Sequence, residues 1–168
     1  MRPCSVVLSL LGPNIEQKDI SPALYPDYYT NVICPAMRAV GIRRLIAMGT
    51  ITIARPEDHF AVFHVIGRVF MRLFSAAIDA NMQNLLHAFE TNLGDLDWTV
   101  FRIARLSGES DTASWTEDRT GNVFCGAVGE NGWTTSISRA TLAKWVVDNI
   151  DERRWYRKMP AVSGLNER

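Results

Sequence analysis

The sequence carries no net charge and almost no lysine, and each shortage excludes a class of function. Eighteen basic residues balance eighteen acidic ones, so no overall field attracts nucleic acid or an anionic membrane. Only Lys18, Lys144 and Lys158 are lysines, which leaves few candidates for a catalytic amine. We therefore expect neither nucleic acid nor a membrane among the partners of the chain.

Cysteine is also scarce, and metal-ligand spacing is missing. The three cysteines, Cys4, Cys34 and Cys125, are odd in number and far apart, so they fit neither a disulfide framework nor paired metal ligands. His59 and His64 lie five residues apart, which puts them on different faces of a helix. We expect no metal site. No targeting signal or membrane-length apolar run is present, and a reduced, cytoplasmic setting is the simplest interpretation.

Short apolar runs that stop at turn residues predict buried strands. Gly12 closes the first run and Gly49 closes the second. The runs cover residues 5–11, 44–48, 98–101 and 123–128, with a last short strand expected within 159–165.

Between these runs, apolar residues recur at helical spacing. Residues 28–40 predict a helix that Gly41 stops, with Pro35 as a kink or a late start. Residues 60–89 predict two consecutive helices broken near 75–79. The apolar stripe at 60–74 is interpreted by default as core, with a hydrophobic substrate wall or a partner face as alternatives. A further helix begins at Ser138, which we expect to be its N-cap.

Strands that alternate with helices imply βαβ units and therefore an α/β fold with a mostly parallel sheet. With 168 residues, of which 47% are hydrophobic, the chain is long enough for one domain, residues 1–168, around one sizeable core. Residues 107–121 are rich in Gly, Ser, Asp, Glu and Thr, which predicts a surface loop.

Three strings, and a weaker fourth, carry a resemblance to a known family. They are Val-Val-Leu-Ser-Leu-Leu-Gly at 6–12, Ala-Val-Gly-Ile-Arg-Arg-Leu-Ile-Ala-Met-Gly-Thr at 39–50, Leu-Asp-Trp-Thr-Val-Phe-Arg at 96–102 followed by Leu106, and Ser-Ile-Ser-Arg-Ala at 136–140. The first three look like the fourth, fifth and sixth strands of the atypical short-chain dehydrogenase/reductases with NAD(P)H-binding, NmrA-like domains, and the weaker string looks like the start of their penultimate helix. The resemblance spans roughly residues 4–165.

This resemblance implies a three-layer Rossmann-like fold, NADP or NAD as cofactor, and a site along the carboxyl ends of the strands. The implied site residues are Leu11, Gly12, Met48 and Gly49 for the cofactor, Thr50 and Arg102 for catalysis, and Ile103 and Leu106 for the substrate side.

Two of these residues also have a structural interpretation. Thr50 is interpreted first as a threonine that ends a strand or caps a turn. Arg102 is equally suited to pairing with a nearby acid, for which Asp95, Asp97 and Glu109 are the candidates.

The chain departs from the family pattern in two ways. Nothing before Cys4 supplies the strand, glycine loop and helix that grip the cofactor diphosphate, so we expect an N-terminally truncated sheet with weakened or lost cofactor binding. No tyrosine is followed four residues later by lysine, so the usual acid–base pair is missing. Asp79 and Gln83 stand near the positions of the family's frequent Lys and Glu.

One glycine motif in the chain, Gly126-x-x-Gly129-x-x-Gly132, suggests a phosphate-binding loop. The expected helix does not open at the motif, because four residues, 133–136, intervene before the cap. We favour an ordinary glycine loop.

These observations favour an NAD(P)-dependent oxidoreductase-like protein, named so by resemblance. One alternative is a non-catalytic, NmrA-like regulatory or interaction module that uses its sheet edge or the 60–74 face to bind a protein partner or a second copy of itself. Another is a non-redox isomerase or cyclase acting on a small hydrophobic metabolite. The chain is also compatible with a fragment of a longer reductase.

Overall fold

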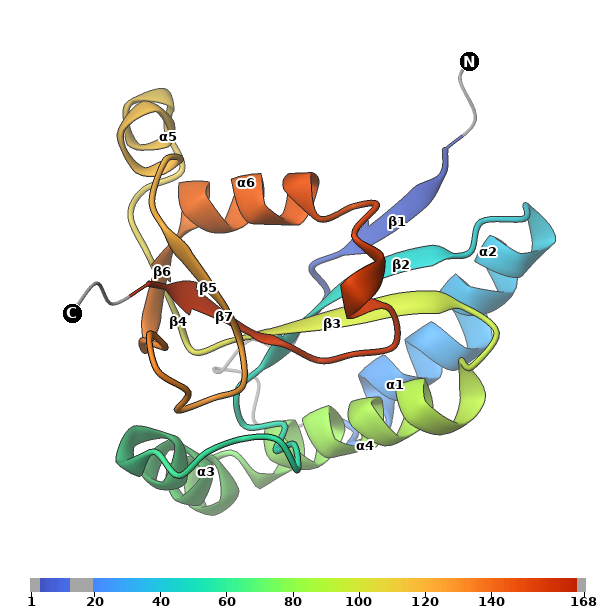
Figure 1. Cartoon of the computed structure of the whole chain (residues 1–168). Helices are drawn as coiled ribbons and strands as arrows, with labels where there is room; N and C mark the ends of the chain where they lie inside the picture. The colour runs from blue at the N-terminus through green and yellow to red at the C-terminus, as the bar shows by residue number, and fades with distance from the viewer. Residues whose placement is uncertain (1–3, 13–19, 166–168) are drawn as a thin grey trace.

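The fold is built on a five-stranded sheet with the strand order β1-β2-β3-β7-β5. The structure is a computed structural model that describes residues 4–12 and 20–165. Strands β1, β2, β3 and β7 run parallel, and β5 is antiparallel to β7 (Figure 1). The strands are β1 (Val6–Ser9), β2 (Arg44–Thr50), β3 (Asp97–Ile103), β5 (Val123–Gly126) and β7 (Ala161–Gly164), and a separate parallel pair is formed by β4 (Arg105–Ser107) and β6 (Ser136–Ser138).

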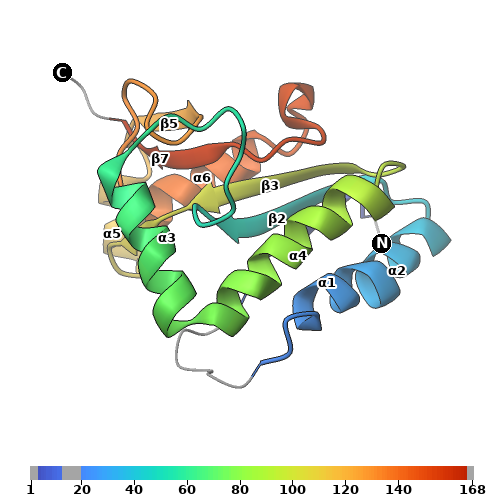
Figure 2. The ribbon, with the colours of Figure 1, turned by 90° about the horizontal axis from the view of Figure 1, so that it is seen from below.

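Helices cover both faces of the sheet. Figure 2 shows α1, α2 and α4 together on one face, with α6 behind the sheet. The sheet and its two helical layers make the three-layer, Rossmann-like α/β fold that the sequence predicted. The helices are α1 (Leu24–Tyr28), the π turn η1 (Tyr29–Ile33), α2 (Cys34–Ala39), α3 (Val62–Phe74), α4 (Ala76–Asn92), α5 (Thr112–Asp118), α6 (Arg139–Asp148) and the 3-10 turn η2 (Arg153–Trp155).

Alternation along the strands divides the core into two parts. Leu45 of β2 and Val100 of β3 are fully buried against the helices of one face, where Phe89 of α4 packs its ring edge-on against Trp98. Neighbouring residues such as Phe101 point to the other face and pack against α6. A sheet buried on both faces explains why its strands appear in the sequence as continuous apolar runs.

The register brings the carboxyl ends of the first three strands to one edge. Strand β2 pairs with β3 along its whole length, from Arg44 opposite Asp97 to Thr50 opposite Ile103. Because β1 pairs with the first part of β2, the segment that follows β1 begins beside the end of β2. This edge is where parallel α/β sheets bind their ligands.

Several local predictions are confirmed. Ser75 separates α3 from α4, and Gly41 follows α2 with a φ of +73°, a left-handed conformation that favours glycine. The Ser138 hydroxyl accepts a hydrogen bond from the Thr141 amide at 3.1 Å, as an N-cap does. Pro35 lies in the first turn of α2, just after the π turn, where its missing N–H is tolerated.

The surface position predicted for residues 107–121 is confirmed, but the prediction that they form a loop was wrong. Residues Thr112–Asp118 form α5, which Asp111 caps by accepting a hydrogen bond from the Ser114 amide at 2.8 Å. None of its residues is buried, so the helix has no apolar stripe that periodicity would reveal.

Candidate functional site

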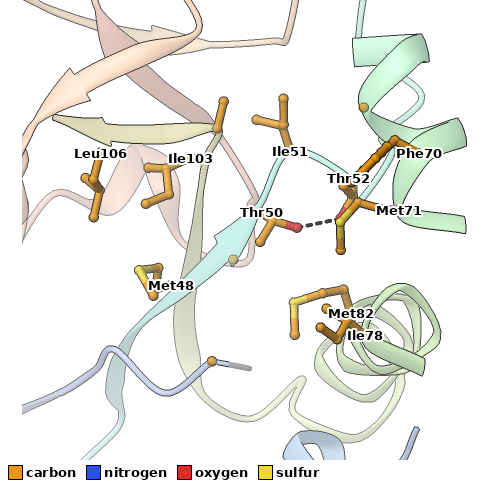
Figure 3. A pocket seen from close by; sticks show the side chains of 14 residues that line it. Met48, Thr50, Ile51, Thr52, Phe70, Met71, Ile78, Met82, Ile103 and Leu106 are labelled. Atoms are coloured by element: carbon orange, nitrogen blue, oxygen red, sulfur yellow. Dashed lines mark hydrogen bonds between the residues drawn. The ribbon is translucent and has the colours of Figure 1, made fainter. Parts of the chain in front are cut away.

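A cavity of about 590 Å³ lies at the carboxyl ends of β2 and β3, between the sheet and helices α3 and α4. Figure 3 shows Met48, Ile103 and Leu106 on one side of it, Thr50 in the middle, and side chains of α3 and α4 opposite. Its lining is Gly12, Met48, Gly49, Thr50, Ile51, Thr52, Gly67, Phe70, Met71, Ile78, Met82, Ile103, Ala104 and Leu106.

The structure brings most of the predicted site residues together around this cavity. Two of them, Leu11 and Arg102, are not part of the lining. Leu11 is exposed beside Gly12, and Arg102 is completely buried. The predicted residues that line the cavity are Gly12, Met48, Gly49, Thr50, Ile103 and Leu106.

The helical half of the cavity comes from residues interpreted by default as core, with a hydrophobic substrate wall as an alternative for the stripe at 60–74 only. Gly67, Phe70 and Met71 come from α3, and Ile78 and Met82 come from α4. Their spacing of three or four residues is the signal of one helix face. The same spacing indicates a core-facing stripe, so it does not by itself distinguish a cavity wall from packed core.

Among the described residues, the cavity lining contains hydroxyl groups but no charged side chain. The Oγ1 atoms of Thr50 and Thr52 lie 2.5 Å apart, drawn as the dashed line in Figure 3. The Thr52 carbonyl accepts a hydrogen bond from the Gln83 side-chain amide of α4 at 3.0 Å, which ties the turn after β2 to that helix. The cavity therefore suits an uncharged molecule that offers a group for hydrogen bonding to these hydroxyls.

Gly49 is required by packing inside the sheet. A Cβ atom at Gly49 would lie 2.8 Å from Cγ1 of Val100 and 3.2 Å from Cδ1 of Ile53, both of which are buried. A Cβ atom at Gly12, in contrast, would meet only the methyl carbon of Met48 among the described residues, at an ordinary 3.6 Å. The close contact that needs glycine at position 49 is thus with the protein's own core.

Each nitrogen atom of the Arg102 guanidinium donates a hydrogen bond to another part of the protein. Its Nη1 and Nη2 atoms donate to the two carboxylate oxygens of Asp58 at 2.6 and 2.8 Å, and its remaining contacts are the carbonyl oxygens of Ile53 and Met159. The partner acid is therefore Asp58, and none of the three acids named from the sequence. Because no part of the guanidinium reaches the cavity wall, we assign Arg102 the structural pairing role in place of the catalytic role that the resemblance implied.

The glycine loop after β5 uses its amides internally. The Val128 amide donates to Asp58 at 3.0 Å, and the Ala127 amide donates to Glu130 at 2.9 Å. Gly129 and Gly132 adopt positive φ angles of +75° and +92°, which turns of this kind require. The chain's own carboxylates occupy these donors, so the structure favours the ordinary-loop interpretation.

Two tyrosines near β1 act as anchors. The Tyr25 hydroxyl donates to the Gly12 carbonyl at 2.9 Å, and the Tyr29 hydroxyl donates to the Ser9 hydroxyl at 2.8 Å. Burial raises the pKa of Tyr29 to about 12, against the lowering effect of the hydrogen bond to Ser9. Neither tyrosine lines the cavity, and a phenol with so high a pKa is a poor proton donor at neutral pH.

Asp79 lies apart from the cavity. It lines a groove between α3 and α4 together with Arg68 and Arg72. Gln83, its neighbour on α4, reaches the Thr52 carbonyl as described above. The described residues therefore place no acid–base pair of tyrosine and lysine at the cavity.

We tested whether the cavity fits a dinucleotide. The hydroxyls of Thr50 and Thr52 and the apolar wall are suited to an uncharged ring such as the dihydronicotinamide of NAD(P)H. A diphosphate needs cations or the free amides of a helix N-terminus, and the described lining residues provide no cation. The fit thus extends to the nicotinamide end alone.

Within residues 4–12 and 20–165, no cluster of His, Cys, Asp and Glu is arranged to hold a metal ion.

Solved structures share this fold at low sequence identity. A proposed NAD-dependent epimerase/dehydratase from Bacillus halodurans superposes with a TM-score of 0.63 at 17% identity, over 95% of this chain and 64% of its own. A short-chain dehydrogenase/reductase from Veillonella parvula gives 0.63 at 16% identity. Its complex with NADP gives 0.61 at 15% identity, and both comparisons cover 95% of this chain and 62% of theirs.

The chain thus spans less than two thirds of the length of these neighbours. No curated protein matches it in sequence. In the described part of the chain, none of the helices has the length and apolar character needed to span a membrane.

The profile of a family described as NAD(P)H-binding matches residues 1–153. This match confirms the resemblance seen in the strand strings and its cofactor class, NADP or NAD. On that evidence, the chain belongs to this NAD(P)H-binding family.

Proposed function

We propose that this protein is an NAD(P)-dependent oxidoreductase-like protein whose cavity receives the nicotinamide end of the cofactor and a substrate beside it. The observation that carries the proposal is the position of the cavity, at the carboxyl ends of parallel strands in a member of an NAD(P)H-binding family. Thr50 lies at the centre of this cavity in Figure 3.

The residues of the cavity have separate roles in this proposal. Thr50 and Thr52 hold an oxygen of the substrate or of the carboxamide by hydrogen bonds, and Met48, Ile103 and Leu106 exclude water from it. When bound, NAD(P)H supplies a hydride. Because the described part of the chain places no tyrosine–lysine pair here, Thr50 orients the reacting oxygen and does not serve as a strong acid.

We expect the affinity of this chain for the whole dinucleotide to be weak. A hydrogen bond to a charged group contributes about 1.5–3 kcal/mol, and the described residues of the cavity lining include no cation to hold a diphosphate. Loss of two such bonds weakens binding by about a hundredfold or more.

The test is a titration of the full 168-residue chain with NADPH, NADH and their oxidised forms, followed by NADPH fluorescence and calorimetry. Ala104 is exposed on the rim of the cavity, so Ala104→Trp blocks the entrance with little effect on folding. Ala113→Trp, at an exposed position on α5, is the matched control. We expect weak binding by the wild type and the control, and at least an about tenfold loss in Ala104→Trp. Absence of binding at millimolar dinucleotide, or equal binding by both variants, would contradict the proposal.

A second candidate function, self-association as an interaction module, is favoured by the outer face of α3. This face exposes more than half of each of five large apolar side chains, and such patches mark interfaces. They are Phe60, which lies just before α3, and Val62, Ile66, Val69 and Leu73 of the helix itself.

Sedimentation of the chain tests the second candidate. If α3 pairs two copies, Ile66→Lys weakens the dimer by at least about tenfold. Val40→Lys, at a position that is 70% exposed after α2, leaves it unchanged. A wild type that stays monomeric at millimolar concentration would exclude this candidate.

A further inference from the structure

We infer that the cavity takes a neutral, largely apolar substrate with one hydrogen-bonding group, such as an alcohol, ketone or aldehyde, and that Gly67 sets the size of molecule that fits. The inference rests on the proposed function, because it names the substrate class of the same site. It is carried by the polarity of the lining and by the space beside one helical glycine.

Gly67 lies inside α3, where glycine is less favourable than alanine. It has helical spacing with His64, which is buried, and with Met71, which lines the cavity. Position 67 therefore faces the same side of the helix as these two residues, toward the body of the protein.

The space in front of Gly67 is open. A Cβ atom built at this position would meet no atom of the described part of the chain within 4 Å, and Gly67 itself lines the cavity. Neither a positive φ nor a close neighbour requires glycine here, because the helix is regular at this point. The missing side chain thus enlarges the cavity, and a longer residue at position 67 would occupy room that a ligand needs.

The lining restricts the charge of the ligand. Thr50 and Thr52 are its only hydroxyl-bearing side chains, and no charged residue stands among the described residues that line the cavity. Transfer of an ionised carboxylate or phosphate from water to such a wall is strongly unfavourable without a paired cation. A single carbonyl or hydroxyl group, in contrast, finds its partner at the threonine pair.

The lining also permits a variety of apolar shapes. Met48, Met71 and Met82 come from β2, α3 and α4 and surround the threonines from different sides (Figure 3). Methionine is unbranched and polarizable, so it adapts to irregular ligands. We therefore expect the cavity to select ligands by their charge and by their bulk near Gly67, and to select only weakly by their exact shape.

The experiment measures binding without a dinucleotide. The neutral fluorophore N-phenyl-1-naphthylamine is titrated into the full chain and then displaced by decan-1-ol, decanal or decanoate at about pH 8, where the acid is ionised. We expect the alcohol and the aldehyde to displace the probe at least about tenfold more effectively than decanoate. Equal displacement by decanoate would overturn the assignment of a neutral ligand.

A substitution series at Gly67 tests the role of that residue. Gly67→Ala is expected to raise the midpoint of thermal unfolding and to leave probe affinity within about twofold. Gly67→Leu and Gly67→Trp are expected to lower probe affinity progressively, by at least about tenfold for Trp, while circular dichroism stays that of the folded wild type. Gly94→Leu is the matched control, since a Cβ atom there also meets nothing within 4 Å but Gly94 lies outside the cavity. Wild-type affinity in Gly67→Trp would overturn the inference.

The two proposals fail separately. If NADPH binds but neither the fluorophore nor decan-1-ol does, the inference on substrate class fails and the proposed cofactor function stands. If decan-1-ol binds in a manner that depends on Gly67 while no dinucleotide binds, the inference stands and the oxidoreductase-like function fails.

Discussion

Arg102 and Asp58 form a two-pronged ion pair inside the protein, with nitrogen–oxygen distances of 2.6 and 2.8 Å. The Arg102 side chain is completely buried, and only 5% of the Asp58 side chain is exposed. Asp58 also accepts hydrogen bonds from the amides of Val128 and Arg55. One carboxylate thereby joins β3, the segment between β2 and α3, and the glycine loop after β5.

We expect this pair to be important for stability. Asp58→Asn removes the negative charge and leaves Arg102 buried without a counter-ion, which costs about 3–5 kcal/mol of unfolding free energy. Asp95→Asn is the control, because it breaks the exposed Arg38–Asp95 pair, for which a loss of about 0–1 kcal/mol is expected. Urea unfolding followed by circular dichroism compares the two. Equal losses in both variants would contradict a structural role for Arg102.

The same pair predicts a loss of stability in acid. Burial by itself raises the pKa of Asp58, but the hydrogen bonds and charge of Arg102, together with the two amides, outweigh it and hold the pKa below its usual range. A carboxyl group with a lowered folded-state pKa stabilises the protein above its unfolded pKa of about 3.9 and loses that contribution as the pH falls further. Urea midpoints measured across this acidic range should fall less steeply in Asp58→Asn than in the wild type. A variant with the wild-type slope would argue against the assignment.

His64 predicts a second pH effect, at weaker acidity. Its Nε2 atom lies 2.7 Å from the Ile51 carbonyl oxygen, which only accepts, so Nε2 carries the hydrogen. Burial lowers the pKa of His64, although the hydrogen bond to Ile51 opposes this shift. The unfolded chain therefore takes up the proton first as the pH falls through about 6.5, and stability declines by about 1.4 kcal/mol for each unit of pKa lowering.

Unfolding free energies measured between about pH 8 and pH 5 check this prediction. We expect the decline to be smaller in His64→Gln than in the wild type. His87→Gln, at an exposed position on α4, should keep the wild-type decline. If it is His87→Gln that flattens the curve, the effect does not come from His64.

The cysteines should differ in reactivity. Burial raises the pKa of Cys34 to about 11 and that of Cys125 to about 12, and the thiolate is the reactive form. Cys4 is exposed. Alkylation of the folded protein by iodoacetamide, followed by mass spectrometry, should modify Cys4 rapidly and the other two slowly. Cys4→Ser should abolish the rapid phase, and denaturant should make all remaining thiols reactive. Rapid modification of Cys125 in the folded chain would contradict its burial.

The strand-borne half of the cavity was accessible from the sequence for a physical reason. Strands buried on both faces appear as continuous apolar runs, and parallel strands end at one edge of their sheet. Met48, Thr50 and Ile103 follow from these two facts. The helix-borne half was only partly accessible. The stripe at 60–74 allowed a substrate wall as an alternative, but Gly67 and Met82 have the spacing of ordinary core residues.

Arg102 illustrates the same limit for a single side chain. The sequence pointed to acids near it along the chain, whereas its partner, Asp58, lies 44 positions away. A buried charge requires a partner of opposite charge, but proximity in the sequence does not determine which acid becomes that partner in the folded protein.

The sequence by itself determined the order and type of the main elements, the break at Ser75, the cap at Ser138 and the family to which the chain belongs. These depend on local periodicity, capping and short strings, which neighbouring residues decide among themselves. Only the tertiary structure decided that Arg102 is buried in an ion pair with Asp58, that the amides of the glycine loop donate to the chain's own carboxylates, and that Gly67 lines a cavity. Those outcomes depend on contacts between segments far apart in the chain, where burial and charge pairing select partners that no local pattern specifies.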